Sequence, residues 1–517
     1  MKFNKSYRFA LCVCSSILYI LSFPMAFGTH PWWNQSYTHV FTLISFLPML
    51  FLSSRSTPRQ SWMWGFVFHA ISGLGTLYWI FISMRQYGDL NVFLATMALI
   101  LIIVVRALVL SIPFYWIGNY RGPYPRVWTA AALTMAEYVF SFFPVGGFPW
   151  IVPSYGLYSD LPLIQIIDVI GTLGLTFLFF LFSTHVVFAM EMWIQGKAKT
   201  LTKTVGMLVG SMIVIHLYGF YQIHRWQSET SKNVLEVAYL QPNISQDVRL
   251  SKGAGPIMYQ RYFDLLSNFD SSHVDLIVWP EAALPQTVSD QVKAFPFLNQ
   301  YAPDAFHVIG AVSWQNMHSQ NSYFNSAFLV DDQGTILSRY DKRHLVPFGE
   351  YVPLVPILQR WIPAIAGDFE AADQLTFFSV NDHRFSTLIC YEVLFPELAR
   401  QAAKQGSEFF VNITNDAWFN NSSGPYQHLR FGAFRAIETR KEIVRSANTG
   451  VSASYTVIGE IQNQTPFFEQ GTKTATLHPN TYKTFYVRFP HLALMIILGL
   501  FFWPALSYFV QRYARQS

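Results

Sequence analysis

Cys390 is the residue in this sequence best placed to act as a nucleophile. It follows an apolar segment, residues 385–389, whose length and polar boundaries are typical of a buried strand, and a strand end presents a side chain rigidly. The other two cysteines, Cys12 and Cys14, lie in an apolar N-terminal segment, where we expect them to pack as small hydrophobic residues. A cysteine at a strand end is more often an inert core residue, so a catalytic role depends on partners.

Two carboxylates and a lysine occupy comparable places upstream of this cysteine. Glu281 follows a short apolar strand pattern that Pro280 ends, and Lys342 follows the strand pattern of residues 335–340. Glu350 comes soon after Lys342, in a turn-rich segment. Each of these charges alone is commonly an exposed loop residue. Together with a cysteine they supply a base, a cation and a nucleophile, which is the set that covalent catalysis at a carbonyl group requires.

The elements that carry these residues alternate between strands and helices. Helical patterns at 259–269 and 427–444 lie among the strand patterns. This alternation predicts a layered α/β domain. The strands are expected at residues 234–240, 276–278, 307–312, 326–330, 335–340, 385–389 and 409–413.

Composition divides the chain into two regions. Hydrophobic residues make up 52% of the sequence and charged residues only 13%, whereas about a quarter of the residues of a soluble protein are charged. Residues 231–479 nevertheless have an ordinary soluble composition. A bilayer span needs about 20 apolar residues. Eight segments reach or approach that length: 8–27, 37–53, 62–84, 92–118, 126–146, 163–194, 204–223 and 489–511.

These segments predict a multi-pass helical membrane bundle of about eight spans joined to the α/β domain. The bundle would cover residues 1–230, the α/β domain 231–487, and a last membrane helix with a short tail 488–517. Lys and Arg concentrate in alternate loops, which places both termini in the cytoplasm and the α/β domain on the opposite side, the periplasm of a bacterium. The basic residues behind the net charge of +5 form no aromatic-interleaved patch, which argues against nucleic-acid binding.

The chain order of Glu281, Lys342 and Cys390, each after a strand pattern, resembles the nitrilase superfamily. The flanking words resemble a narrower family, the apolipoprotein N-acyltransferases of bacterial inner membranes. Those words include Trp279-Pro280-Glu281, Leu345-Val346-Pro347-Phe348-Gly349-Glu350-Tyr351, Cys390-Tyr391-Glu392 and Asn415-Asp416-Ala417-Trp418-Phe419. The match extends through Gly424-Pro425-Tyr426-Gln427-His428, Arg435-Ala436-Ile437-Glu438 and Arg445-Ser446-Ala447-Asn448-Thr449-Gly450, and the N-terminal part adds Gly147-Phe148-Pro149-Trp150.

The resemblance implies a fold of two sheets between helical layers, an αββα sandwich, and a set of residue roles. Glu281 would take the thiol proton of Cys390, and Lys342 would stabilise the oxyanion with a backbone amide near Tyr391. Glu350 would orient Lys342, and Glu392 would support the site. A phospholipid, typically phosphatidylethanolamine, would give its sn-1 acyl chain to the thiol. The α-amine of a diacylglyceryl-cysteine apolipoprotein would then accept it, and no metal or cofactor would be required.

Substrate contacts are expected from four large apolar residues. Trp361 and Ile362 lie in an apolar segment, residues 355–366, which we interpret as an arm that guides acyl chains. Trp418 and Trp150 belong to the sequence motifs listed above for the family. The sequence departs from the family at residues 246–250, where Leu250 stands in place of the usual tryptophan.

Two other functions remain open from the sequence. The protein could be a membrane-tethered amidase of the nitrilase type, but a tether needs one span and eight are predicted. It could also be a non-catalytic lipid-binding module. The presence of Glu281, Lys342 and Cys390 together argues against that second reading.

Overall fold

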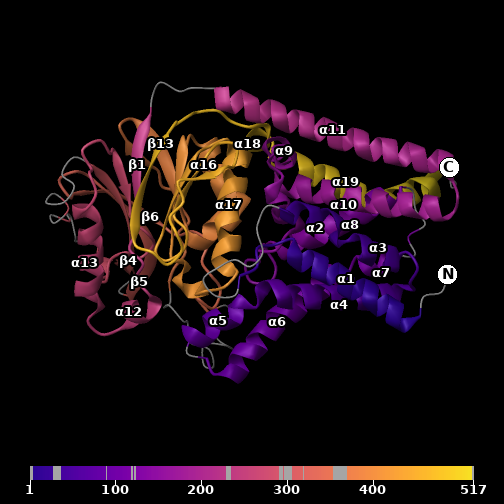
Figure 1. Cartoon of the computed structure of the whole chain (residues 1–517), viewed down its shortest axis with the longest axis horizontal. Helices are drawn as coiled ribbons and strands as arrows, with labels where there is room; N and C mark the ends of the chain where they lie inside the picture. The colour runs from indigo at the N-terminus through magenta and orange to yellow at the C-terminus, as the bar shows by residue number, and fades with distance from the viewer. Residues whose placement is uncertain are drawn as a thin grey trace. The chain divides into compact units, whose positions relative to one another are not determined.

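The computed structural model of the chain describes residues 4–26, 37–88, 90–117, 120, 124–228, 234–289, 295, 298, 305–317, 320–352 and 369–514. The chain forms two compact units (Figure 1). The helical unit comprises Met1–Phe81, Asn91–His224 and Phe489–Ser517, and the sheet unit comprises Ile82–Leu90 and Arg225–Arg488. The short segment Ile82–Leu90 therefore belongs with the sheets, although it lies between apolar helices in the sequence.

Helices occur in all eight segments that the sequence predicts as spans, and several of those segments contain more than one helix. The helices are α1 (Lys5–Leu21), α2 (Thr38–Ser45), α3 (Leu47–Ser53), α4 (Pro58–Leu77), α5 (Trp79–Gln86), α6 (Val92–Ser111), α8 (Pro125–Phe140), α10 (Ile167–Ile194), α11 (Ala198–Ser228) and α19 (Leu492–Ala514). Among the described residues, three helical stretches are long and apolar enough to cross a membrane: Val92–Ile117, α10 and α11. The pair α4 and α5, bent by 53°, would make a fourth. The count of about eight spans therefore stays a prediction.

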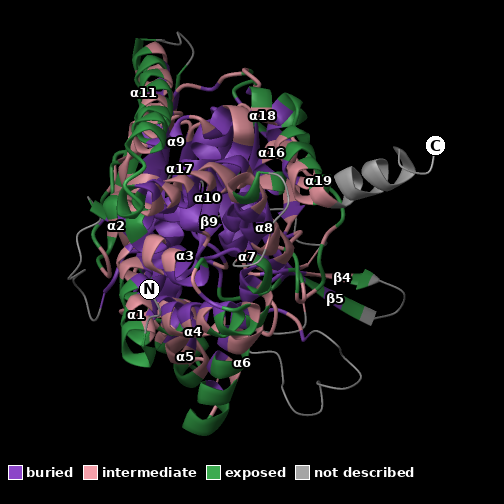
Figure 2. Ribbon diagram, turned by 90° about the vertical axis from the view of Figure 1, so that its right-hand side faces the viewer, coloured by how far each residue is buried: buried purple, intermediate pink, exposed green. Residues whose placement is uncertain are grey.

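The helical unit separates apolar and polar side chains in the way a bilayer demands. Helix α11 is largely exposed (Figure 2), and its outward side chains include Val214, Leu217 and Phe220. The charged residues Arg106 and Glu137 are instead buried within the unit. Charged groups are costly in lipid and apolar groups are not, so this distribution fits a membrane-embedded bundle.

The first sheet of the sheet unit has the strand order β13-β1-β2-β4-β5-β6, with β3 paired to β4. Strands β1, β2 and β4 run parallel to one another, and β5 and β6 continue the sheet antiparallel. The strands are β1 (Leu235–Gln241), β2 (Leu276–Val278), β3 (Val288–Ser289), β4 (Phe306–Met317), β5 (Gln320–Val330), β6 (Ile336–Asp341) and β13 (Gly471–Leu477).

The second sheet has the strand order β12-β11-β10-β9-β8-β7. Its central strands β8, β9 and β10 are parallel neighbours. Every residue of β9 and β10 is buried, including the polar side chains of Asn412 and Arg445. The strands are β7 (Phe378–Val380), β8 (His383–Ile389), β9 (Phe409–Thr414), β10 (Ile443–Ala447), β11 (Ala453–Tyr455) and β12 (Ile461–Gln462).

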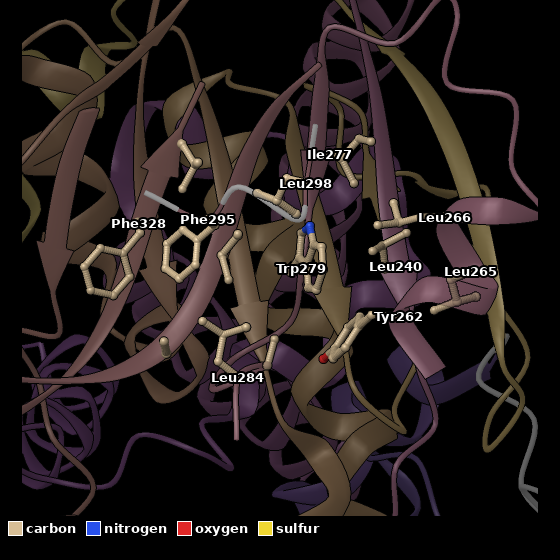
Figure 3. Close-up of a cluster of buried hydrophobic side chains, with 14 of the residues drawn as sticks. Leu240, Tyr262, Leu265, Leu266, Ile277, Trp279, Leu284, Phe295, Leu298 and Phe328 are labelled. Atoms are coloured by element: carbon tan, nitrogen blue, oxygen red, sulfur yellow. The ribbon is translucent and has the colours of Figure 1, made fainter. Parts of the chain in front are cut away.

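Two apolar clusters define the layers. One cluster joins the facing sides of the two sheets, with Val237 and Val278 from the first and Ile389 and Val411 from the second. The other packs the first sheet against α13 (Ala254–Ser267) (Figure 3). Helices α16 (Pro396–Lys404) and α17 (Gly424–Thr439) contact the second sheet. The order is helices, sheet, sheet, helices, so the prediction of an α/β domain is confirmed.

Several predicted elements differ in extent from the structure. The helix predicted at 427–444 ends at Thr439, because Arg440 takes a left-handed conformation with φ of 52°, and β10 begins at Ile443. A short apolar pair such as Ile443-Val444 fits helical and strand patterns equally well. Strands β4 and β5 are also longer than predicted, since the polar residues near their hairpin interrupt the apolar pattern without ending the pairing.

Candidate active site

The candidate catalytic residues all follow strands that end near one another. Cys390 comes directly after β8, Asn415 directly after β9 and Lys342 directly after β6. Glu281 follows β2 by three residues. Its Oε2 accepts a hydrogen bond of 2.9 Å from the Asn415 backbone amide, which joins the ends of the two sheets. The structure therefore brings the predicted base, cation and nucleophile to one edge of the sandwich.

Lys342 lies between two carboxylates. Its Nζ is 2.9 Å from Glu350 Oε1 and 3.5 Å from Glu281 Oε1, and the Lys342 side chain is 1% exposed. Burial alone would lower the pKa of Lys342, but Glu350, Glu281 and Cys390 together raise it above its usual value. The ammonium group is therefore charged, and it is held without contact with bulk water.

Asn325 on β5 completes this cluster, and sequence reasoning missed it. Its Nδ2 donates hydrogen bonds of 2.7 Å to both Glu281 Oε1 and Glu350 Oε1. The Lys342 backbone amide donates to the Asn325 carbonyl at 2.8 Å. β5 holds several polar residues, so the sequence offered no clear signal for this one.

Cys390 begins a short 3-10 turn, Cys390–Leu394, with a φ of 51°. This left-handed conformation is uncommon for a residue with a side chain and is often found at functional sites. Burial, followed by the Glu281 carboxylate, raises the pKa of the Cys390 thiol well above its usual value, although Lys342 lowers it. The thiol is therefore protonated at neutral pH and needs a base before it can attack.

Glu392 braces the two strand ends that carry the cation and the nucleophile. Its carboxylate accepts hydrogen bonds from the Ile389 amide at 2.8 Å, the Arg343 amide at 2.7 Å and the Tyr340 hydroxyl at 2.9 Å. Burial raises the pKa of Glu392 even though these hydrogen bonds oppose the shift. The side chain is fully buried. Glu392 therefore links the backbone after β6 to the end of β8.

Trp279 anchors the segment that carries Glu281. Its ring stacks on Tyr262 with centroids 4.4 Å apart, and its Nε1 donates to His307 Nδ1 at 3.1 Å. Figure 3 shows both rings within the apolar cluster under the first sheet. Because Trp279 is fully buried, the chain leaves β2 in a fixed direction and delivers Glu281 two residues later.

Gly310 on β4 makes room for that segment. A Cβ at this position would lie 2.3 Å from the Pro280 carbonyl oxygen and 2.8 Å from the Glu281 Cα. We expect Gly310→Ala to displace Glu281 and to lower the kcat of the predicted acyl transfer by about 100-fold, because misplacing a catalytic group by about 1 Å can lower a rate that much. Steady-state kinetics of the purified variant measure this.

Gly255→Ala is the matched control, because its added Cβ would meet Pro285 side-chain atoms only at ordinary contact distances of 3.7 Å and 3.8 Å. Gly255 lies in the first turn of α13. We expect this control to keep wild-type kinetics. A Gly310→Ala protein with unchanged kcat would show that the base does not depend on this close approach.

The other predicted residues are placed as follows. The Tyr391 ring is buried and packs against His344 and Phe395, with centroids at 5.8 Å and 5.0 Å. Trp418 is half-buried, meets the Tyr87 ring edge-on at 5.8 Å, and accepts a hydrogen bond of 2.7 Å from Ser83 at its carbonyl. Both of these partners belong to the sheet unit through its segment Ile82–Leu90.

Trp150 lies in the helical unit and is 2% exposed. Its ring lies 4.7 Å from Trp79 and 5.7 Å from Phe148, measured between centroids. Trp361 and Ile362, with the rest of the predicted arm at 355–366, fall outside the described residues. Within the described part of the chain, no group of three or more His, Cys, Asp or Glu side chains is arranged to hold a metal ion.

Comparison with known proteins gives two family matches. Residues 236–486 match the carbon-nitrogen hydrolase family, and residues 10–185 match the apolipoprotein N-acyltransferase N-terminal domain. Among solved structures, Nit3 of Saccharomyces cerevisiae, a member of the nitrilase superfamily, is 16% identical with a TM-score of 0.37. That alignment covers 52% of this chain and 96% of Nit3.

Curated relatives extend the match to almost the whole sequence. The apolipoprotein N-acyltransferase of Geobacter metallireducens is 33% identical over 498 residues, which cover 93% of this chain and 91% of the relative. The enzyme of the same name from Haemophilus ducreyi is 31% identical, with 80% of this chain and 81% of the relative covered. This chain belongs to the apolipoprotein N-acyltransferases, the membrane-embedded acyltransferases of the nitrilase superfamily.

Proposed function

We propose that this acyltransferase works through a thioester on Cys390, with a phospholipid as acyl donor and the α-amine of a diacylglyceryl-cysteine lipoprotein as acceptor. The observation that carries the proposal is the buried Lys342 cation, which lies between Glu281 and Glu350. Its positive charge lowers the pKa of the Cys390 thiol. A fixed cation beside a nucleophile in a site with little water stabilises developing negative charge far better than water does.

In the first half-reaction, Glu281 removes the Cys390 thiol proton while Sγ bonds to the ester carbonyl carbon of the donor. The carbonyl oxygen becomes an oxyanion that Lys342 Nζ and the Tyr391 amide stabilise. When this intermediate collapses, the ester C–O bond breaks and Glu281 returns the proton to the glycerol oxygen. A lysophospholipid leaves and the thioester remains.

In the second half-reaction, the acceptor amine bonds to the thioester carbonyl carbon and Glu281 takes a proton from its nitrogen. The C–S bond then breaks, an amide forms, and the proton returns to the Cys390 sulfur. Each half-reaction uses the same base and the same oxyanion site, so a single set of residues suffices for both. The donor we propose is phosphatidylethanolamine, through its sn-1 chain.

The test follows an acyl group through both steps by mass spectrometry. Purified protein is mixed with phosphatidylethanolamine that carries a heavy-isotope sn-1 chain. The protein is then digested, and the masses of its cysteine-containing peptides are measured. We expect the heavy acyl mass on the Cys390 peptide and not on peptides that contain Cys12 or Cys14, which serve as controls within the same chain. Addition of a diacylglyceryl-cysteine peptide should discharge the adduct and make that peptide heavier.

The same experiment separates transfer from hydrolysis, the alternative that the Glu, Lys and Cys set leaves open. If the thioester disappears equally fast with and without the acceptor peptide, water is the acceptor and the protein is a hydrolase. If no adduct forms on Cys390 under turnover, the thioester mechanism is wrong.

We further propose that the catalytic domain, residues 231–487, lies in the periplasm and that both termini are cytoplasmic. Lys203 and Lys473 are both exposed, so cysteines placed there report the two predicted sides. In a Cys14→Ser background, which removes the exposed native cysteine, a membrane-impermeant maleimide added to intact cells should label Lys473→Cys and not Lys203→Cys. Labelling of both positions in intact cells would contradict this topology.

A further inference from the structure

A buried histidine holds the backbone carbonyl of the candidate nucleophile. His428, on α17, is fully buried, and its Nε2 lies 3.2 Å from the Cys390 carbonyl oxygen. A carbonyl oxygen only accepts hydrogen bonds, so Nε2 carries a hydrogen and donates it. The other ring nitrogen, Nδ1, bears no hydrogen in the neutral ring and accepts a hydrogen bond of 3.1 Å from Arg445 Nη2, with Asp416 Oδ1 2.8 Å away. The ring is therefore fixed at both ends.

Asp416 is itself held in place by neighbouring polar groups. Arg445 on β10 donates to Asp416 Oδ2 at 2.7 Å, and the Thr414 hydroxyl donates to Oδ1 at 3.1 Å. Burial alone would raise the pKa of Asp416, but Arg445 and His428 lower it to about 2. The carboxylate is therefore ionised at any pH at which the enzyme works.

The same hydrogen-bond network also reaches β8, the strand that precedes Cys390. The second arm of the guanidinium, Arg445 Nη1, donates to Asn412 Oδ1 at 2.7 Å, and Asn412 Nδ2 donates to the Leu388 carbonyl at 2.7 Å. Gly450 leaves room for the carboxylate, because a Cβ there would lie 2.2 Å from Asp416 Oδ2. Charged and amide groups thus join the ends of β8, β9 and β10 and helix α17, in addition to the apolar packing between the sheets.

Stability alone does not account for this network. Burying charged groups is expensive, and apolar side chains of similar volume often stabilise a core as well or better. The network instead supplies a directed contact on one atom, the Cys390 carbonyl oxygen. That oxygen belongs to a residue in a left-handed conformation, which neighbouring structure must maintain.

The position of this carbonyl sets the direction of the next amide. A trans peptide unit is planar, and its C=O and N–H point in opposite directions. The donor that holds the Cys390 oxygen therefore also fixes the Tyr391 N–H on the other side of the same peptide. In the proposed function, that N–H is one of the two groups that meet the oxyanion.

We propose that His428 is a positioning residue, which fixes the Cys390–Tyr391 peptide so that the Tyr391 amide meets the oxyanion. The inference rests on the proposed thioester chemistry and adds a residue to it. Arg445, which is paired with Asp416, donates to Nδ1 and orients the imidazole. His428 contacts the Cys390 backbone, so its role lies in stabilising the oxyanion and not in activating the thiol.

Two reactions of the same thiol test this role. Acylation of Cys390 by a p-nitrophenyl ester passes through an oxyanion, whereas alkylation by iodoacetamide displaces iodide and forms none. His428→Asn retains an amide near Asp416 but is too short to reach the Cys390 carbonyl. We expect its acylation rate to fall by about 100-fold, as when an oxyanion donor is lost, and its alkylation rate to stay close to wild type.

His428→Gln serves as the conservative rescue, because its longer side chain can place an amide donor near the former Nε2. We expect it to recover most of the acylation rate. The matched control is His383→Asn, the same substitution at the opposite end of β8, where His383 pairs with Glu408 at 2.8 Å. That variant should acylate and alkylate like the wild type.

Two results would overturn the inference. An equal fall of acylation and alkylation in His428→Asn would mean that the histidine acts on the thiol or on the fold. Unchanged acylation would mean that the peptide holds its direction without it. A wild-type protein that takes no acyl group from the ester, while iodoacetamide still labels Cys390, would instead refute the proposed thioester function.

Discussion

Cys390→Ala is expected to abolish acyl transfer, with a loss of about a million-fold, the size seen when an enzyme loses its nucleophile. The substitution removes only the sulfur atom, and a left-handed φ is no harder for alanine than for cysteine. The fold should therefore be unaffected. Transfer of a labelled acyl chain from phospholipid to a diacylglyceryl-cysteine peptide gives the rate, and thermal unfolding in detergent tests the fold.

Cys12→Ala is the matched control, since Cys12 is also a buried free cysteine but lies in the helical unit. It should keep the wild-type rate. Measurable transfer by Cys390→Ala, above the rate of a protein-free reaction, would mean that another group carries the acyl chain or that the amine attacks the phospholipid directly.

Glu281→Gln distinguishes two effects of the Glu281 carboxylate: its action as a proton acceptor and the effect of its negative charge on the pKa of the Cys390 thiol. The Glu281 carboxylate raises the pKa of the Cys390 thiol, so the neutral amide should lower that pKa. The pH at which iodoacetamide alkylation is half-maximal should then fall, because more thiolate exists at a given pH. Acyl transfer should nevertheless collapse, because the amide cannot accept a proton. A parallel rise in both rates would show that Glu281 is not the base.

The sequence predicted strands at the positions of β2, β6 and β8, because local patterns specify them. Glu281, Lys342 and Cys390 follow those strands, and their catalytic roles stay predictions. Parallel strands then gather their carboxyl ends at one edge, and the pairing of β8 with β9 does this in the second sheet. The prediction of these three positions as neighbours therefore needed little more than strand order.

The residues that the sequence left unassigned depend on contacts across the fold. Asn325 bridges two carboxylates only because β5 lies between β4 and β6. Arg445 reaches Asp416 because a strand, and not the predicted helix, begins at Ile443. The segment Ile82–Leu90 reads as the end of an apolar helix, yet it belongs to the sheet unit. Neither hydropathy nor periodicity carries that information.

Lys342→Met should lose both stability and activity, for separate reasons. The methionine fills a similar volume, but Glu281 and Glu350 are then buried without a cation. Removing one partner of a buried ion pair costs about 3–5 kcal/mol, and this should appear as a lower free energy of unfolding in detergent. The oxyanion also loses its cation, which should lower the rate of acyl transfer by at least about 100-fold.

The double variant Lys342→Met/Glu350→Gln distinguishes these two effects. Neutralising Glu350 removes one buried charge, so we expect the double variant to regain a large part of the lost stability. Its activity should stay low, because no cation returns to the oxyanion site. Lys473→Met is the matched control, and this exposed lysine on β13 should change the free energy of unfolding by less than about 0.5 kcal/mol. If the double variant recovered acyl transfer together with stability, Lys342 would be a structural counter-ion only, and another group would have to stabilise the oxyanion.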